Sequence, residues 1–358
     1  MQSFHKIFAV IFITALPVSA WGTRADTNAE KAAAKLLKER MKTQRPEDLA
    51  ILEAAAGKDI VVVRGSMDHI ETILSAAGIE HTLINPAQVA TADLMADQIV
   101  MVNCPGRIPA PGIRRVEKFV RAGGLLYTTD WALANLVQKA FPRTIAHNGG
   151  STGDHVTPVE VHEHHDNIMT NMLLRNDSKP QWWLEGGSYP VKILNKQVVT
   201  VLASSPQMKK MYKAAPVVVR FPWEDGQVIH VVSHFYRQAA TTGPKVATKS
   251  KINEIKGLTE KQKKELAASE EANVDLSEVE SSYAFQQMTG NIVVNKARDN
   301  KDLDKQYGYE NRAEVVVDGR KVPARSRLKV LKRKNGRSWV RDDRGNEAWV
   351  NDATLEAR

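Results

Sequence analysis

The sequence predicts an α/β protein with a mainly parallel, doubly wound sheet, followed by a small all-β barrel. Four apolar runs alternate with amphipathic helical patterns between Asp59 and Phe141. More apolar runs follow up to His234, and closely spaced strand patterns fill the last fifty residues. Such alternation indicates βαβ units and a parallel sheet covered on both faces. In such sheets binding and chemistry gather at the carboxyl ends of the strands.

The expected elements follow in chain order. Strands are predicted at 59–64, 79–85, 98–104 and 124–130, with helices at 67–78 and 111–124 between them. After Phe141 the predicted strands are 156–161, 191–194, 198–202, 216–220 and 227–234. A helical pattern at 279–296 is expected to return and cover the sheet.

The first twenty residues have the pattern of a secretory signal peptide. Lys6 supplies the positive charge, Ile7 to Val18 the apolar stretch, and Val18-Ser19-Ala20 the small residues of a cleavage site. About a dozen apolar residues are too few to span a bilayer, which needs roughly 20. We therefore expect a secreted or periplasmic protein with no transmembrane segment after cleavage.

Chain length, composition and turn residues predict the domain boundaries. Residues 21–57 are expected to form a helical lead-in, and 58–297 an α/β domain with a flexible, Lys-rich insertion at 238–275. A polar linker at 298–309 precedes the barrel at 310–358. Turns at Asp318-Gly319, Asn335-Gly336 and Arg344-Gly345 separate the strands of the barrel.

The net charge indicates the kind of partner the protein attracts, and the cysteine content excludes a disulfide-stabilised fold. A formal net charge of +9 favours attraction to anionic surfaces such as envelope polymers. Cys104 is the only cysteine, so an intramolecular disulfide framework is excluded. Cys104 ends a predicted strand, and we expect it to be buried without a chemical role, since no histidine lies nearby in sequence.

Three segments resemble the class I glutamine amidotransferase-like superfamily, in its divergent trehalose-utilisation-type branch. They are 116–126 (VEKFVRAGGLL), 165–169 (HDNIM) and 226–234 (GQVIHVVSH). The resemblance implies a nucleophilic cysteine on the turn after the strand at 124–130. Here that turn is Thr128-Thr129-Asp130-Trp131-Ala132, so glutaminase chemistry is not expected. Residues 328–350 resemble bacterial SH3-like domains.

Asp130 and His234 are the candidate catalytic residues. Both end predicted strands, and a carboxylate with an imidazole can act as nucleophile or base. The alternative is that Asp130 caps the next helix by accepting backbone N–H bonds, which is the commoner role of such a residue.

A histidine cluster offers a candidate zinc site. His162, His164 and His165 are ligand-type side chains, and the first two would share one face of a strand. The cluster lacks an established metal spacing, so a polar loop or a hydrogen-bonded network is the alternative.

Trp182, Trp183 and Tyr189 are the candidate ligand-binding aromatics. Beside glycines they could line a cleft for a small polar or carbohydrate-like ligand. An anchor in the core followed by a loop is the equally weighted alternative.

The basic run from Arg325 to Arg337 is expected to lie on the surface of the barrel. It lacks interleaved stacking aromatics, so we do not expect nucleic acid as a partner. A cell-wall peptide, an anionic polymer, or docking onto the chain's own α/β domain remain open.

Taken together, the sequence favours an exported binding or scaffold protein of the cell envelope over an enzyme, with no cofactor. The alternative is a hydrolase that uses Asp130 with His234, or zinc at the histidine cluster. Convergence of these side chains within hydrogen-bond reach would distinguish the two.

Overall fold

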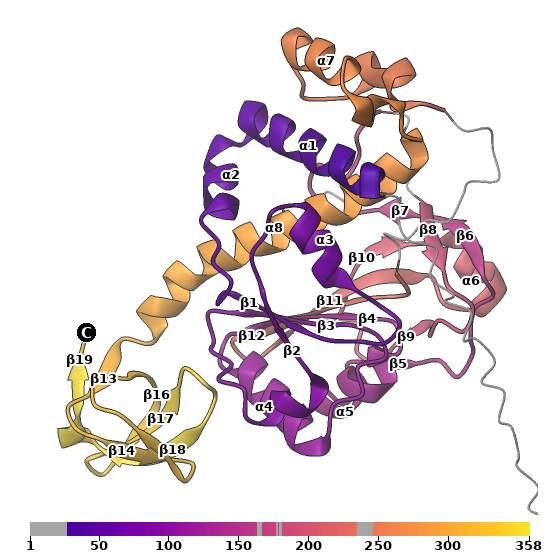
Figure 1. Cartoon of the computed structure of the whole chain (residues 1–358). Helices are drawn as coiled ribbons and strands as arrows, with labels where there is room; N and C mark the ends of the chain where they lie inside the picture. The colour runs from indigo at the N-terminus through magenta and orange to yellow at the C-terminus, as the bar shows by residue number, and fades with distance from the viewer. Residues whose placement is uncertain (1–26, 163–166, 177, 179–180, 235–245) are drawn as a thin grey trace, which may run out of the picture.

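The computed structural model describes residues 27–162, 167–176, 178, 181–234 and 246–358 (Figure 1). The expected signal peptide at 1–20 lies outside the described residues.

The core of the α/β domain is an eight-stranded sheet in the order β2-β1-β3-β4-β12-β11-β10-β7. Its strands are β1 (Ile60–Val63), β2 (Thr82–Ile84), β3 (Ile99–Val102), β4 (Leu125–Thr129), β7 (Glu160–Val161), β10 (Thr200–Ser204), β11 (Pro216–Trp223) and β12 (Gly226–Val231). The five strands from β2 to β12 in that order are parallel, and β11, β10 and β7 continue antiparallel.

The α/β fold class is therefore confirmed, but the sheet is mixed rather than mainly parallel. For β11 the cause lies in its connection to β12. β11 and β12 are joined by Glu224 and Asp225 alone, and a two-residue connection permits only antiparallel pairing. The parallel strands, by contrast, are separated by longer segments that contain helices.

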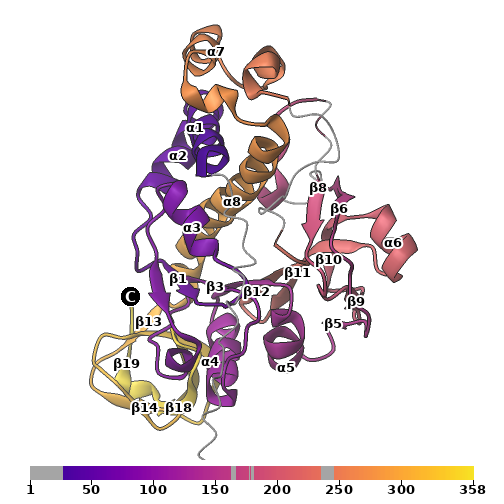
Figure 2. The ribbon, with the colours of Figure 1, turned by 45° about the vertical axis from the view of Figure 1, so that its right-hand side comes forward.

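Helices cover both faces of the sheet (Figures 1 and 2). One face carries α4 (Ala110–Arg121) and α5 (Gln138–Ala140); the other carries α1 (Thr27–Gln44), α2 (Pro46–Glu53), α3 (Ile70–Ala76) and α8 (Leu276–Gln306). Edge-to-face aromatic pairs connect the layers: Tyr127 of β4 with Phe285 of α8 at 6.5 Å, and Phe141 with Phe221 of β11 at 5.9 Å.

Smaller elements flank the sheet. β5 (Ile145–His147) pairs with β9 (Val191–Ile193), and β6 (His155–Pro158) pairs with β8 (Gln181–Leu184), beside α6 (Pro206–Tyr212). The short helices are η1 (Pro86–Ala90), η2 (Leu133–Val137), η4 (Asn167–Met169), η5 (Thr248–Glu254), η6 (Glu270–Asn273) and η7 (Asp352–Thr354).

Two segments, one expected to be a flexible insertion with a solvated helix at 261–268 and the other a polar linker, contain packed helices where the structure describes them. In the Lys-rich insertion, α7 (Glu260–Ala267) buries Leu266, and Gln262 Nε2 donates to Glu39 Oε2 of α1 at 2.8 Å. In the expected linker, α8 continues to Gln306 because Leu303 is buried against Gly123. Tertiary packing of a few apolar residues thus outweighs a polar composition.

The C-terminal β domain (residues 309–357) contains a five-stranded antiparallel sheet in the order β18-β17-β16-β13-β19. These strands are β13 (Tyr309–Asn311), β16 (Arg327–Lys334), β17 (Arg337–Asp342), β18 (Glu347–Asn351) and β19 (Leu355–Ala357). A hairpin of β14 (Val315–Val317) and β15 (Arg320–Val322) adds to its small core.

The C-terminal β domain docks against α4 and the amino-terminal edge of the parallel strands. Arg341 donates to Asp225 Oδ2 at 2.9 Å and to the Arg121 carbonyl at 2.9 Å. Arg327 and Arg344 form ion pairs with Asp97 and Asp93. Several arginines of this domain are therefore paired with carboxylates of the α/β domain and are not available to an outside partner.

The tip of the β16–β17 hairpin is exposed to solvent. We define this tip as Lys332, Arg333, Lys334 and Arg337, all of which are exposed. Among the helices of the described residues, none combines the length and apolar character needed to cross a bilayer.

Replacing Arg341 with methionine should loosen this docking. Arg341 is 5 % exposed, and its loss leaves the carboxylates of Asp225 and Glu347 short of a donor. We expect the free energy of unfolding to fall by about 2–3 kcal/mol in urea titrations. The control Arg333→Met, at the exposed tip, should cost about 1 kcal/mol or less. Equal losses in both variants would contradict the assigned role of Arg341.

Candidate functional site

The carboxyl ends of the parallel strands bring a cluster of polar side chains together. Asp68 follows β1, Cys104 follows β3, Asp130 follows β4 and His234 follows β12. All four are buried, with at most 3 % of any residue exposed. One ligand-type atom each of Cys104, Asp130 and His234 lies within 4.8 Å of the others. We call these residues, together with Glu185, the strand-tip cluster.

Asp130 occupies the sharp turn after β4. Its φ of 44° lies in the left-handed region, which non-glycine residues seldom adopt and which is found at strained functional turns. Its carboxylate accepts from the Tyr189 N–H at 2.9 Å and from the Ser188 hydroxyl at 3.1 Å. The following helix has no side-chain cap, so the capping alternative for Asp130 is wrong. Burial raises the pKa of Asp130 to about 6.

His234 is held between carboxylates. Its Nδ1 bonds to Glu185, and its Nε2 lies 3.8 Å from Asp68 Oδ2. Burial alone would lower the pKa of His234, but the Asp68 carboxylate and the neighbouring Cys104 and Glu185 side chains raise it well above its usual value.

Cys104 lies beside the imidazole of His234, although the two are distant in sequence. The Thr129 hydroxyl accepts from the Cys104 N–H at 3.1 Å and donates to Asp68 Oδ2 at 2.6 Å, so it joins two strand ends. Burial raises the pKa of the Cys104 thiol, while His234 acts in the opposite direction. Cys104 is buried as expected, and although no histidine is close to it in sequence, the fold brings the His234 imidazole within 4.8 Å of the thiol.

The strand-tip cluster contains two buried polar atoms that lack a hydrogen-bond partner in the structure, Asp68 Oδ1 and His234 Nε2. Unsatisfied buried polar atoms are uncommon in native proteins and call for an explanation. Sulfur, nitrogen and carboxylate oxygen together suit either proton transfer or a metal ion.

The three candidate aromatic residues have different surroundings. Tyr189 lies next to Asp130 through its backbone and stacks between Trp131 and His147, with ring centroids 5.7 and 4.0 Å away. Trp182 is buried in the core. Trp183 donates to Asp154 at 2.7 Å, on the flanking β6–β8 pair.

Of the proposed histidine metal site, only His162 is described. Its Nε2 lies 3.0 Å from the Ser204 hydroxyl, a contact that agrees with the hydrogen-bonded alternative. His164 and His165 lie outside the described residues, so zinc at this cluster stays a prediction.

Sequence reasoning missed Asp68 and Glu185. Asp68 could have been found, because it follows the predicted strand 59–64 on the same edge as Asp130. Glu185 could not, because it comes from the flanking β8 and reaches His234 only through the tertiary arrangement.

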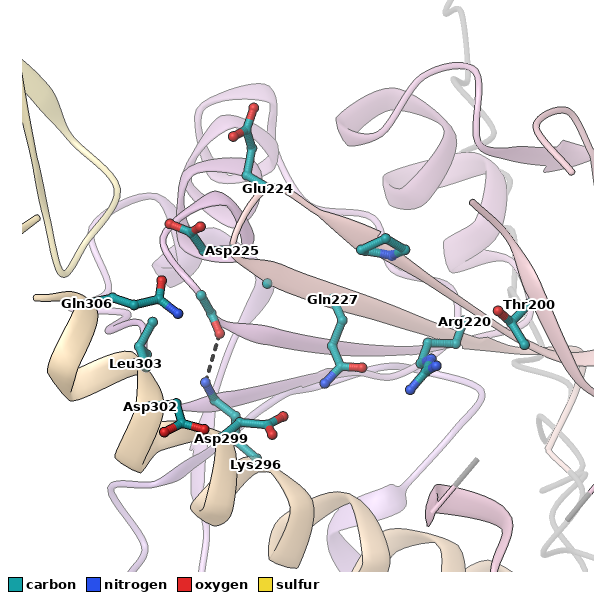
Figure 3. Close-up of a pocket in the computed structure, with 13 residues that line it drawn as sticks. Thr200, Arg220, Glu224, Asp225, Gln227, Lys296, Asp299, Asp302, Leu303 and Gln306 are labelled. Atoms are coloured by element: carbon teal, nitrogen blue, oxygen red, sulfur yellow. Dashed lines mark hydrogen bonds between the residues drawn. The ribbon is translucent and has the colours of Figure 1, made fainter. Parts of the chain in front are cut away.

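A cleft of about 420 Å³ lies at the opposite, amino-terminal edge of the sheet (Figure 3). It is bounded by the starts of β4 and β12, by β11 and by α8. Lys296, which is 4 % exposed, donates to the carbonyls of Gly123 at 2.8 Å and Ala96 at 2.6 Å. Acidic and basic side chains both line the cleft: Arg220, Glu224, Asp225, Lys296, Asp299 and Asp302.

No protein-family model matches this chain, and the comparison with curated proteins found no match. Solved structures give partial likenesses in fold. A β-galactosidase from Bacillus circulans has a TM-score of 0.39 at 11 % identity, over 87 % of this chain and 43 % of that one. The carbohydrate deacetylase Agd3 has 0.38 at 12 %, over 56 % and 31 %.

A putative ThuA-like protein from Bacteroides uniformis has a TM-score of 0.34 at 12 % identity, over 50 % of this chain and 82 % of that one. This chain spans less than half of the β-galactosidase and of the deacetylase. The amidotransferase-like and SH3-like assignments stay predictions, whereas the α/β fold with a C-terminal antiparallel sheet is established.

Because Lys296 is buried, the free energy of unfolding should vary with pH in the alkaline range. Burial lowers its pKa from 10.5 to about 8. Between these values the unfolded chain binds more protons than the folded one, so stability should rise with pH, by up to about 1.4 kcal/mol per unit. Denaturant titrations from pH 7.5 to 10.5 should lose this rise in Lys296→Met and keep it in Lys301→Met, an exposed control on α8. Parallel curves for all three proteins would contradict the assignment.

Proposed function

We propose that this protein is a hydrolase whose chemistry takes place at the strand-tip cluster. The observation that carries the proposal is the convergence of Asp130 and His234 with Cys104 within 4.8 Å, at the carboxyl edge of the parallel strands. The separation exceeds a direct hydrogen bond but is one that a single water molecule can bridge, and this convergence leads us to prefer the enzyme.

The roles follow from the contacts. Glu185 accepts at His234 Nδ1 and orients the ring, so that Nε2 is the free nitrogen for chemistry. Ser188 and the Tyr189 N–H fix the Asp130 carboxylate. Asp130 and His234 would together orient and activate a water molecule for attack on a small polar substrate. Glu185, with 27 % of its side chain exposed, connects the cluster to the surface.

The glutaminase reaction is not part of the proposal. The turn after β4 carries Asp130 rather than a cysteine, and Cys104 belongs to the neighbouring strand end. We assign the domain to an amidotransferase-like fold without that activity, in a protein expected to be exported to the envelope.

Asp130→Asn tests the proposal. An amide cannot accept the proton that the carboxylate would take, so hydrolysis should fall by at least about 100-fold. Purified wild type is assayed on chromogenic esters, glycosides and acetylated sugars, and the variant on whichever substrate is cleaved. Asp154→Asn, the matched control on the flanking loop, should keep full activity. Full activity in Asp130→Asn, or no hydrolysis by wild type, would contradict the hydrolase.

A second role, binding to an anionic envelope polymer through the SH3-like C-terminal β domain, is supported by the hairpin tip. Lys332 and Lys334 are exposed and have no ion pair in the described part of the chain, whereas Arg327, Arg341 and Arg344 are paired. A wall peptide is the other partner we consider for this domain.

Charge reversal tests this second role. The double variant Lys332→Glu and Lys334→Glu should lose most co-sedimentation with purified cell wall, because the attraction is electrostatic and screened by salt. Reversing two exposed lysines far from the tip, Lys209 and Lys210 of α6, is the control and should keep binding. Equal retention of both variants would remove the tip as the binding surface.

A further inference from the structure

We propose that the strand-tip cluster binds a divalent transition-metal ion of the zinc class, with Cys104, Asp130 and His234 as its ligands. The inference deepens the proposed hydrolase, on whose site it rests: a bound ion would supply the Lewis acid that activates water, and Asp130 and His234 would then act by holding the ion rather than by contacting the water directly. This site is distinct from the zinc site that the sequence suggested at His162, His164 and His165.

The donor atoms match this class of ion. One thiol sulfur, one imidazole nitrogen and one carboxylate oxygen are the ligand types that zinc takes in proteins, commonly three at a site with an open position. With bonds of about 2.0–2.3 Å, donors around a tetrahedral zinc lie roughly 3.3–3.8 Å apart. The three atoms here lie within 4.8 Å of one another, so shifts of about 1 Å would close them around an ion.

The free nitrogen of His234 is an independent indication of a ligand. His234 is 1 % exposed, and its Nε2 has no hydrogen-bond partner. Its Nδ1 bonds to Glu185. Metal-bound histidines usually donate their second ring nitrogen to a carboxylate in this way, which fixes the tautomer and the ring orientation.

The carboxylates around the site are also oriented as supporting groups. Ser188 and the Tyr189 N–H hold Asp130, and the Thr129 hydroxyl holds Asp68 Oδ2. Asp68 Oδ1 remains buried without a partner, and Asp68 Oδ2 lies 3.8 Å from His234 Nε2.

The local charge favours a cation. Three carboxylates, those of Asp68, Asp130 and Glu185, surround a single imidazole in a region with little access to water. Buried charges are stable only when they are compensated. A thiol–imidazole pair acting alone would leave Asp68 Oδ1 unpartnered, whereas a dication would compensate the excess of negative groups.

Metal binding is tested on the full chain purified without a His-tag. We expect one Zn²⁺ per chain by elemental analysis and calorimetric titration. Co²⁺ should give a thiolate-to-cobalt charge-transfer absorption that disappears in Cys104→Ser. Asp130→Asn and His234→Gln should weaken Zn²⁺ binding by at least about 100-fold, and Glu185→Gln by about 10- to 100-fold.

His162→Gln is the matched control and should bind Zn²⁺ as wild type does. Loss of binding in this control with retention in His234→Gln would move the ion to the histidine cluster and overturn the inference. Wild type that binds no ion, or a cobalt complex without the thiolate band, would overturn it as well, whether or not the variants fold.

The outcomes separate the two proposals. Hydrolysis by wild type that binds no Zn²⁺ and gives no thiolate-to-cobalt band would remove the metal site and leave the hydrolase. Zinc bound through Cys104 in a chain that cleaves no substrate would keep the metal site and remove the hydrolase.

Discussion

Charge balance at the carboxyl edge of the sheet is the constraint on which this molecule depends. Asp68, Asp130 and Glu185 surround His234 where little water reaches, and isolated buried charges are strongly unfavourable. The neighbouring groups meet this cost through fixed hydrogen bonds from the Thr129 and Ser188 hydroxyls and from a backbone N–H. The same arrangement that makes the charges tolerable also holds their remaining lone pairs in place for chemistry.

The sheet supplies this arrangement through its pairing. In the parallel part, β4 pairs with β3 on one side and β12 on the other, so the chain leaves all three strands at one edge. Residues that are 130 positions apart, Cys104 and His234, thereby become neighbours. The turn at Asp130 has an unfavourable φ, which the surrounding structure must stabilise, as is common where a side chain is aimed for function.

Sequence patterns predicted the parallel strands and two residues of the cluster, because period and strand-end position are local properties. They did not predict the antiparallel half of the sheet, which depends on the short β11–β12 turn, or the helical linker, which depends on Leu303 packing on Gly123. Glu185 was out of reach because it comes from a strand outside the main sheet. The pairing of Cys104 with His234 is likewise beyond sequence patterns, because the two residues meet only through the order of the strands in the sheet.

Residues that line the cleft at the amino-terminal edge of the sheet also contact the C-terminal β domain. Asp225 and Gln306 line the cleft, and Lys329 of the C-terminal β domain contacts both, at 2.7 and 2.9 Å. A ligand that bound Asp225 and Gln306 would compete with Lys329 for them and so weaken the attachment of the C-terminal β domain. By thermodynamic reciprocity, release of that domain would alter the affinity for such a ligand by the same factor, so contacts at this junction would couple ligand binding to domain attachment.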